Sequence, residues 1–242
     1  MFLGIIVNSL SVVFGGLAGT VLSRRLSEAF RENLNMVLGA CAMTMGIASI
    51  IQLSNLPAVI LSVIVGTVVG LWLRLGQLLR RGGIQMQRGV CALLRQTDGN
   101  FSAEQEQTLI TAVVLFCASG TGIYGAIVAG MTGEQSILLS KSILDFVTAL
   151  IFACILGPVT SVIAVPQFGI YLVLIFLARF IFPLCTPSMI GDFKSAGGIL
   201  LLATGFRMLK LRDFPVAEMI PAMVVVMPIS YLWTAWVVPF LA

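Results

Sequence analysis

Residues 137–157 read ILLSKSILDFVTALIFACILG, an apolar run that contains two charged residues. A helix that spans a bilayer needs about 20 mainly apolar residues, and this segment supplies them. Lys141 and Asp145 are four residues apart, so a helix places both on one face. At about 1.5 Å per residue, Asp145 lies only about 3 Å from the middle of the segment. A lone carboxylate at that depth is costly, so Asp145 must face protein, water or a cation.

The composition of the whole chain also indicates a membrane protein. Hydrophobic residues make up 59% of the 242 residues and charged residues only 10%, whereas soluble domains carry roughly 25% charged residues. We therefore predict an all-α, polytopic transmembrane helix bundle of about eight spans, with seven as the alternative, in a single domain covering residues 1–242. The expected spans lie near 3–22, 34–52, 57–76, 108–130, 137–157, 163–183, 195–210 and 216–238.

Two segments between the expected spans have alternative interpretations. Pro158 and Pro166 make residues 158–170 either a re-entrant segment or a loop between spans. The polar stretch 77–107 is expected to be a cytoplasmic loop. Within it, residues 84–95 have apolar residues at helical spacing and form either an interfacial helix or part of a solvated linker.

The basic residues predict the orientation of the chain. Arginine and lysine cluster after the first, third and seventh expected spans, whereas the loops 53–56 and 131–136 contain neither. With eight spans, the positive-inside rule places both termini on the periplasmic side of a bacterial inner membrane.

Glycine spacing suggests how the helices pack. Gly39 and Gly46 are seven residues apart, as are Gly198 and Gly205, and each pair is followed by a proline. This match is either coincidence or the trace of an inverted internal repeat of the kind found in transporters. The glycines of the first and third expected spans predict close helix packing, and such faces are also able to join a homodimer.

The polar residues within the spans are the candidate site. The Ser119–Gly122 segment (Ser119, Gly120, Thr121 and Gly122) is a weak helix former that either allows close packing or interrupts its helix. Asn8 either bonds across helices or lines a pathway, and Arg179 is a second candidate partner for Asp145. Lys141 and Asp145 either lock their helix in place or form an ion, proton or solute site.

The sequence lacks the residues of several chemistries. It contains no histidine, H-E-x-x-H, G-x-G-x-x-G or P-loop, and Asp145 is the only acid deep in an expected span. We therefore predict no enzymatic activity, no cofactor and no metal. Because the basic residues that give the net charge of +4 are dispersed, we expect no nucleic-acid partner. The expected partners are the lipid bilayer and an unidentified small solute or ion.

Four segments carry a resemblance to a known family. They are residues 114–157, LCTPSMIGDFKSAGGILLLATG at 184–205, FPVAEMIPA at 214–222, and the N-terminal NSLSVVFGG. The chain resembles the uncharacterised bacterial multipass family typified by YqgA and YdfK, and especially its YqgA-like branch. The family patterns F-C-x-S-G and K-S-x-L-D fall on Phe116, Cys117, Ser119, Gly120, Lys141, Ser142, Leu144 and Asp145. The resemblance implies an integral membrane or transport protein with no agreed substrate.

These observations lead to one leading functional hypothesis and one alternative. The first is a small-solute or ion transporter with a polar site between the spans that contain Asn8, Ser119–Gly122 and Asp145. The alternative is a non-catalytic membrane subunit or scaffold whose polar residues only lock helix packing.

Overall fold

The computed structural model describes residues 2–23, 26–93 and 103–241, and in these ranges the chain forms helices joined by short connections. Contacts divide the chain into two compact units. Unit 1 comprises Met1–Asn35 and Gln77–Ala178, and unit 2 comprises Met36–Gly76 and Arg179–Ala242. In chain order the elements are α1 (Leu3–Leu22), α2 (Glu28–Ile50), α3 (Leu56–Trp72), α4 (Leu75–Leu93), α5 (Ala103–Cys117), α6 (Gly120–Thr132), α7 (Ser136–Leu156), α8 (Val159–Val162), α9 (Ala164–Ile181), the 3₁₀ turn η1 (Phe182–Leu184), α10 (Pro187–Met208), α11 (Val216–Met219), α12 (Ala222–Leu232), the π-helical turn η2 (Trp233–Val237) and α13 (Val238–Leu241).

Several of these helices are suited to a bilayer. Within the described ranges, six are long and apolar enough to cross it, namely Leu3–Leu22, Glu28–Ile50, Thr108–Thr132, Ser136–Leu156, Val159–Leu184 and Val216–Phe240. A seventh is added if the bent pair Leu56–Trp72 and Leu75–Met86 is one span. The expected all-helical fold with several spans is confirmed, whereas the count of eight stays a prediction.

The expected span 195–210 differs most from the structure. Its helix, α10, begins eight residues earlier, at Pro187, where the Thr186 side chain accepts a hydrogen bond from the Met189 backbone and caps the helix. This N-terminal extension contains Asp192 and Lys194, which lower the hydropathy of the helix. For that reason α10 is not among the candidate spans although it has 22 residues.

Within residues 158–170 the helix is interrupted only at Ile163, between α8 and α9. Pro158 precedes α8, and Pro166 is the third residue of α9, where a missing N–H costs little because the first turn lacks acceptors for its N–H groups. Residues 158–170 therefore belong to the beginning of the candidate span Val159–Leu184.

Of the two alternatives for residues 84–95, the structure shows a helix as far as residue 93. This helix, α4, is longer than expected and is described as far as Leu93. Arg95 and the rest of 94–102 lie outside the described residues.

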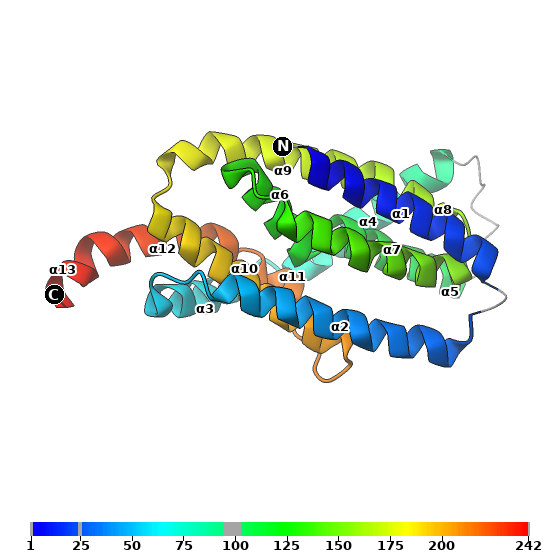
Figure 1. The fold of residues 1–242 in the computed structure, drawn as a ribbon, viewed down its shortest axis with the longest axis horizontal. Helices are drawn as coiled ribbons and strands as arrows, with labels where there is room; N and C mark the ends of the chain where they lie inside the picture. The colour runs from blue at the N-terminus through cyan, green and yellow to red at the C-terminus, as the bar shows by residue number, and fades with distance from the viewer. Residues whose placement is uncertain (1, 24–25, 94–102, 242) are drawn as a thin grey trace. The chain divides into compact units, whose positions relative to one another are not determined.

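In unit 1, α1 packs along α7 through a seam of small residues, and Figure 1 shows the two helices side by side. A Cβ atom added at Gly15 or Gly19 would collide with the carbonyl oxygen of Phe146 or Leu150, respectively. The packing predicted for the glycines of the first span is confirmed. These glycines are buried within the chain, so they do not offer a face for a homodimer.

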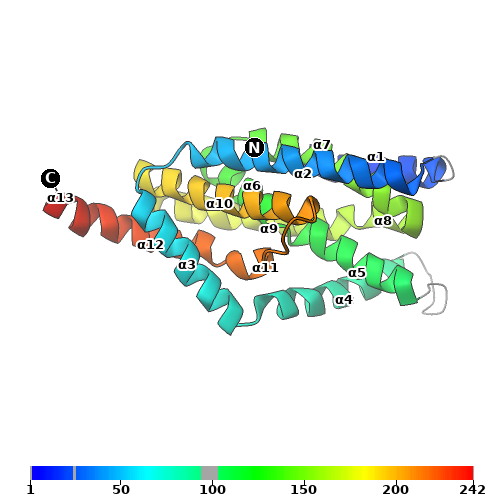
Figure 2. The same ribbon diagram turned by 90° about the horizontal axis from the view of Figure 1, so that it is seen from below.

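In unit 2, α3 lies against α11 and α12, as Figure 2 shows. Close approach again depends on glycine, because a Cβ atom at Gly66 or Gly70 would collide with the backbone of Ala222 or Glu218. The third expected span therefore also packs through glycine.

The glycine pairs considered as a repeat contact one another within unit 2. A Cβ atom added at Gly46 would lie 2.7 Å from the Gly198 carbonyl oxygen, and one at Gly198 would lie 2.6 Å from the Gly46 oxygen. Gly39 and Gly205 face each other in the same way. Antiparallel packing of α2 on α10 explains the equal spacing, so this pattern gives no support to an inverted repeat.

Candidate functional site

A buried ion pair lies on α7. The Lys141 ammonium donates to both carboxylate oxygens of Asp145, at 2.5 Å and 2.6 Å. The two residues are only 3% and 6% exposed, and their four-residue separation lets one helix hold both side chains on the same face. The charges therefore neutralise each other inside unit 1.

Amide side chains from two other helices donate hydrogen bonds to the carboxylate of the ion pair. Asn8 on α1 donates to Asp145 Oδ2 at 2.8 Å. Gln167 on α9 donates to the same oxygen at 3.1 Å and to Asn8 Oδ1 at 2.9 Å. Both amides are completely buried. We call Asn8, Lys141, Asp145 and Gln167 the polar cluster; it links three helices of unit 1.

One atom of the polar cluster retains unused hydrogen-bonding capacity. Among the described residues, Gln167 Oε1 has no hydrogen-bond partner although it is buried. A buried acceptor without a partner is costly, so Gln167 Oε1 is a position at which a donor on a ligand or a water molecule would be stabilised.

The span Thr108–Thr132 is interrupted at its centre. α5 ends at Cys117, and α6 begins at Gly120 after Ser119, whose Oγ accepts a hydrogen bond from the Gly122 N–H. On the other side of the break, the Tyr171 hydroxyl donates to the Phe116 carbonyl oxygen at 2.7 Å. Of the two alternatives for this segment, the structure shows the interrupted helix.

The break and the polar cluster form one site. A Cβ atom at Gly122 would collide with the Tyr171 hydroxyl and lie 3.0 Å from Lys141 Cε. The positive end of the α6 dipole therefore lies beside the ion pair.

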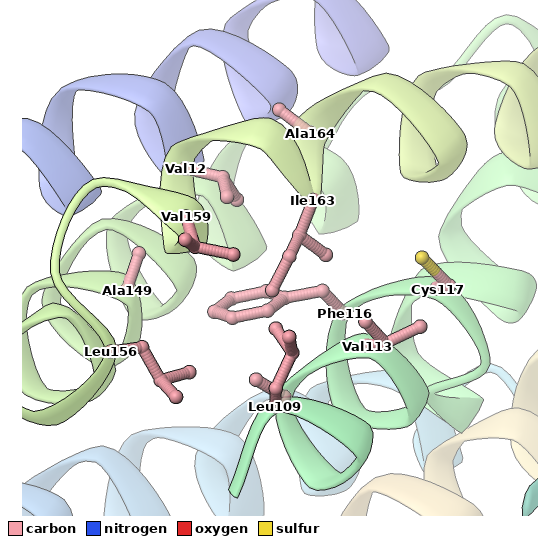
Figure 3. Packing of buried hydrophobic residues seen from close by; sticks show 11 residues of the cluster. Val12, Leu109, Val113, Phe116, Cys117, Ala149, Leu156, Val159, Ile163 and Ala164 are labelled. Carbon is pink, nitrogen blue, oxygen red and sulfur yellow. The ribbon is translucent and has the colours of Figure 1, made fainter. Parts of the chain in front are cut away.

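A hydrophobic cluster holds α5, the helix that precedes the break, in position. The ring of Phe116 is completely buried, and Figure 3 shows it among Leu109, Val159 and Ile163. This cluster also includes Val12 of α1 and Ala149 of α7. The helices that supply Asn8, Lys141 and Asp145 are thus packed against the helix that ends at the break.

Most of the candidate residues lie together. Asn8, Lys141, Asp145 and Ser119–Gly122 are all at this site. Arg179 is not, so of the two candidate partners of Asp145 the structure shows Lys141. Arg179 is exposed in the last turn of α9, twelve residues from Gln167 and therefore about 18 Å farther along the helix.

Sequence reasoning missed Gln167 and Tyr171. Both lie in α9, four residues apart, and both are completely buried. An amide and a hydroxyl at helical spacing within an apolar segment are the signal that identifies them. Pro158 and Pro166 instead favoured a re-entrant segment or a loop over residues 158–170.

A second buried acid was also missed. Asp192 on α10 of unit 2 is completely buried, so Asp145 is not the only deeply buried acid. Asp192 accepts hydrogen bonds from the backbone N–H groups of Ser54 and Asn55 at 2.9 Å and 2.7 Å, and from the Ser230 hydroxyl at 2.6 Å. These bonds satisfy the N-terminus of α3, so we assign Asp192 a structural role.

Replacing Gly122 with alanine tests the contact between the break and the ion pair. The added methyl group is expected to displace Tyr171 and lower the free energy of unfolding by about 1–3 kcal/mol. Shortening the opposing side chain with Tyr171→Leu relieves the collision. The double variant should therefore lose less stability than the sum of the single variants, measured by denaturant titration in detergent.

Gly169→Ala is the matched control for Gly122→Ala, because nothing lies within 4 Å of a Cβ atom added there. Strictly additive losses in the Gly122→Ala and Tyr171→Leu variants would contradict the contact.

The site has no cluster typical of a metal centre. Across the described ranges, no three His, Cys, Asp or Glu side chains lie together as they would around a metal ion. The chemistry available to the site is the binding of a charged or hydrogen-bonding group by one ammonium, one carboxylate, two amides, a tyrosine hydroxyl and the N-terminus of α6.

The several helices that are long and apolar enough to cross a bilayer indicate a multipass membrane protein. The chain belongs to the family described as "Protein of unknown function (DUF554)", whose model matches residues 3–231. The family resemblance in the sequence is thereby confirmed.

Two relatives support this assignment. The chain is 42% identical to the "Uncharacterized protein YqgA" of Escherichia coli (strain K12), over 98% of this chain and 99% of the relative. It is 25% identical to the "Uncharacterized membrane protein YdfK" of Bacillus subtilis (strain 168), over 92% of this chain and 93% of the relative. No solved structure matches the chain.

Proposed function

We propose that the protein is a small-solute or ion transporter whose binding site comprises the polar cluster and the α5–α6 break. The observation that supports this most directly is the Lys141–Asp145 ion pair, buried at the centre of a candidate span and beside an interrupted helix. Ionisable residues within membrane spans commonly mark transport pathways. Interrupted helices in transporters use their freed backbone groups to bind solutes or ions.

The backbone groups freed by the α5–α6 break support a binding role. Backbone groups that lose their helical partners in a bilayer must be satisfied by protein, water or ligand. Ser119 and Tyr171 satisfy Gly122 and Phe116. The N–H groups of Gly120 and Thr121 begin α6, where helix geometry supplies no acceptor for them, and they are suited to a negatively charged or polar ligand group.

The ion pair is not the only feature that holds α1 against α7. The glycine seam at Gly15 and Gly19 already brings these helices into backbone contact. Replacing a buried ion pair by apolar residues is often neutral or stabilising. A function in binding therefore accounts for the polar cluster better than helix locking does.

We also propose a location in the bacterial inner membrane with both termini in the periplasm. The concentration of arginine and lysine in the loops after the first, third and seventh expected spans supports this orientation. We further propose that the protein is not an enzyme, since its sequence carries none of the catalytic motifs considered above.

A thermal-shift screen of the purified protein tests the transport proposal. We expect at least one compound among amino acids, organic acids and common ions to raise the unfolding temperature, since a ligand at about 100 times its Kd adds about 2.7 kcal/mol. The same compound should have no effect on Asp145→Asn or Lys141→Ala variants that still unfold cooperatively.

Retention of the shift in folded Asp145→Asn protein would contradict this site. If no compound shifts the parent and a second protein co-purifies in fixed stoichiometry, the alternative role of membrane subunit or scaffold replaces the transport proposal.

A further inference from the structure

A half-open apolar cavity in unit 1 lies beside the site. Its volume is about 220 Å³, and its walls come from α4, α5, α6 and α9. The cavity reaches both sides of the α5–α6 break, because its lining includes Cys117 and Ala118 before the break and Ile123 after it. Ile170, the neighbour of Tyr171, lines it as well. The cavity therefore lies next to the α5–α6 break, although no residue of the polar cluster lines it.

The size and lining of the cavity suit an apolar group. An engineered apolar cavity of about 150 Å³ stays dry and binds benzene. A cavity of about 220 Å³ therefore has room for a benzyl or branched aliphatic group. Each buried CH₂ group favours binding by about fourfold, so such a group supplies affinity that the polar site alone lacks.

The charges of the polar site restrict the rest of the ligand. Lys141 and Asp145 cancel each other, so a ligand with zero net charge enters this buried site at lower cost than a net anion or cation. The N-terminus of α6 favours a carboxylate. Gln167 Oε1, which is buried and unpartnered among the described residues, favours a donor such as an ammonium group.

We propose that the ligand is a zwitterion with an apolar body, that is, an aliphatic or aromatic α-amino acid. Its side chain occupies the cavity, its carboxylate lies at the N-terminus of α6, and its ammonium group lies near Gln167. This inference rests on the proposed transport function and names its substrate class.

Two glycines provide a matched pair of variants. Gly82 lines the cavity, and nothing lies within 4 Å of a Cβ atom added there. Gly169, in the same unit, also has open space around an added Cβ atom but does not line the cavity. Because Gly82 lines the cavity, leucine at position 82 is expected to reduce the cavity volume, whereas leucine at position 169 is expected to leave it unchanged.

Equilibrium binding of radiolabelled L-phenylalanine to the detergent-purified full-length protein tests the proposal. Gly82→Leu is expected to weaken binding at least tenfold and Gly169→Leu by less than twofold. In competition, 3-phenylpropanoate lacks the ammonium group and 2-phenylethylamine lacks the carboxylate, so each should bind at least tenfold more weakly. Glycine lacks the apolar body and should bind at least a hundredfold more weakly.

A second measurement requires no variant. Cys117 lines the cavity and is only 2% exposed, so N-phenylmaleimide reaches it only when the site opens. Bound L-phenylalanine should slow this alkylation at least threefold, measured by mass spectrometry. The exposed Cys41 in unit 2 is the internal control. This measurement decides the role of the cavity even if Gly82→Leu does not fold.

The outcomes separate this inference from the transport proposal. Equal binding by the Gly82→Leu and Gly169→Leu proteins, or unprotected Cys117, would overturn the cavity assignment. Equal binding of 3-phenylpropanoate would overturn the zwitterion. If the site binds another solute in an Asp145-dependent way but no L-phenylalanine, the inference fails and the transport proposal stands. If the parent binds no compound, both fail.

Discussion

Replacing Asp145 alone with leucine is expected to lower the free energy of unfolding by about 3–5 kcal/mol. Removal of one partner of a buried ion pair leaves the other charge buried without compensation. In this chain the uncompensated charge would be Lys141, which is only 3% exposed. Asn8 and Gln167 would each also lose an acceptor.

The double variant Lys141→Met/Asp145→Leu is expected to recover part of this loss and to remain about 1–3 kcal/mol less stable than the parent, because the buried Asn8 amide still lacks its acceptor. Apolar residues of similar volume often replace a buried ion pair without loss. A double-mutant cycle compares the parent with Asp145→Leu, Lys141→Met and the double variant. The free energy of unfolding of each protein is measured by denaturant titration in detergent.

This cycle separates stability from function. A stable double variant that no longer binds the solute found by the screen shows that the ion pair is required for binding and not for folding. A double variant that is as unstable as Asp145→Leu would show that the pair locks the helices, and would favour the scaffold role.

Replacing Gly15 with alanine is the second substitution with a large expected effect. The new Cβ atom would collide with the Phe146 carbonyl oxygen and lie 3.1 Å from the Ala149 Cβ atom. Backbone cannot yield as a flexible side chain does, so α1 must move away from α7. We expect a loss of about 1–3 kcal/mol, accompanied by weaker solute binding because Asn8 lies on the same helix.

Gly169→Ala is the control for Gly15→Ala. Position 169 is exposed, with open space around an added Cβ atom, and alanine favours a helix over glycine by about 1 kcal/mol. The two substitutions should therefore change stability in opposite directions, as measured by the same titration. A neutral Gly15→Ala variant would contradict the packing of α1 on α7.

Local features of the sequence predicted the helices well. α1 has the predicted bounds, 3–22, and α7 differs from the predicted 137–157 by one residue at each end. Backbone groups in a bilayer must bond within their own segment, so an apolar run of about 20 residues forms a helix whatever its neighbours are. The boundary of α10 was predicted poorly, because the polar residues that begin it are stabilised by distant contacts of Asp192.

Part of the candidate site was predictable because it depends on local sequence alone. The pairing of Lys141 with Asp145 depends only on helical spacing, so it could be predicted from one segment. The sequence alone did not predict the break at Ser119–Gly122, because a glycine-rich segment either allows close helix packing or interrupts the helix. The Tyr171 hydroxyl, 55 residues from the Phe116 carbonyl that it satisfies, stabilises the interruption.

The sequence by itself determined an all-helical membrane protein with a pair of opposite charges on one face of a central helix, because hydropathy and helical periodicity are local properties. Only the tertiary structure decided which residues surround that pair. Asn8 lies 137 residues from Asp145 and Gln167 lies 22 residues from it, while Arg179 was excluded by its distance along α9. Such contacts depend on how helices pack, and glycine seams that bring backbones together fix that packing.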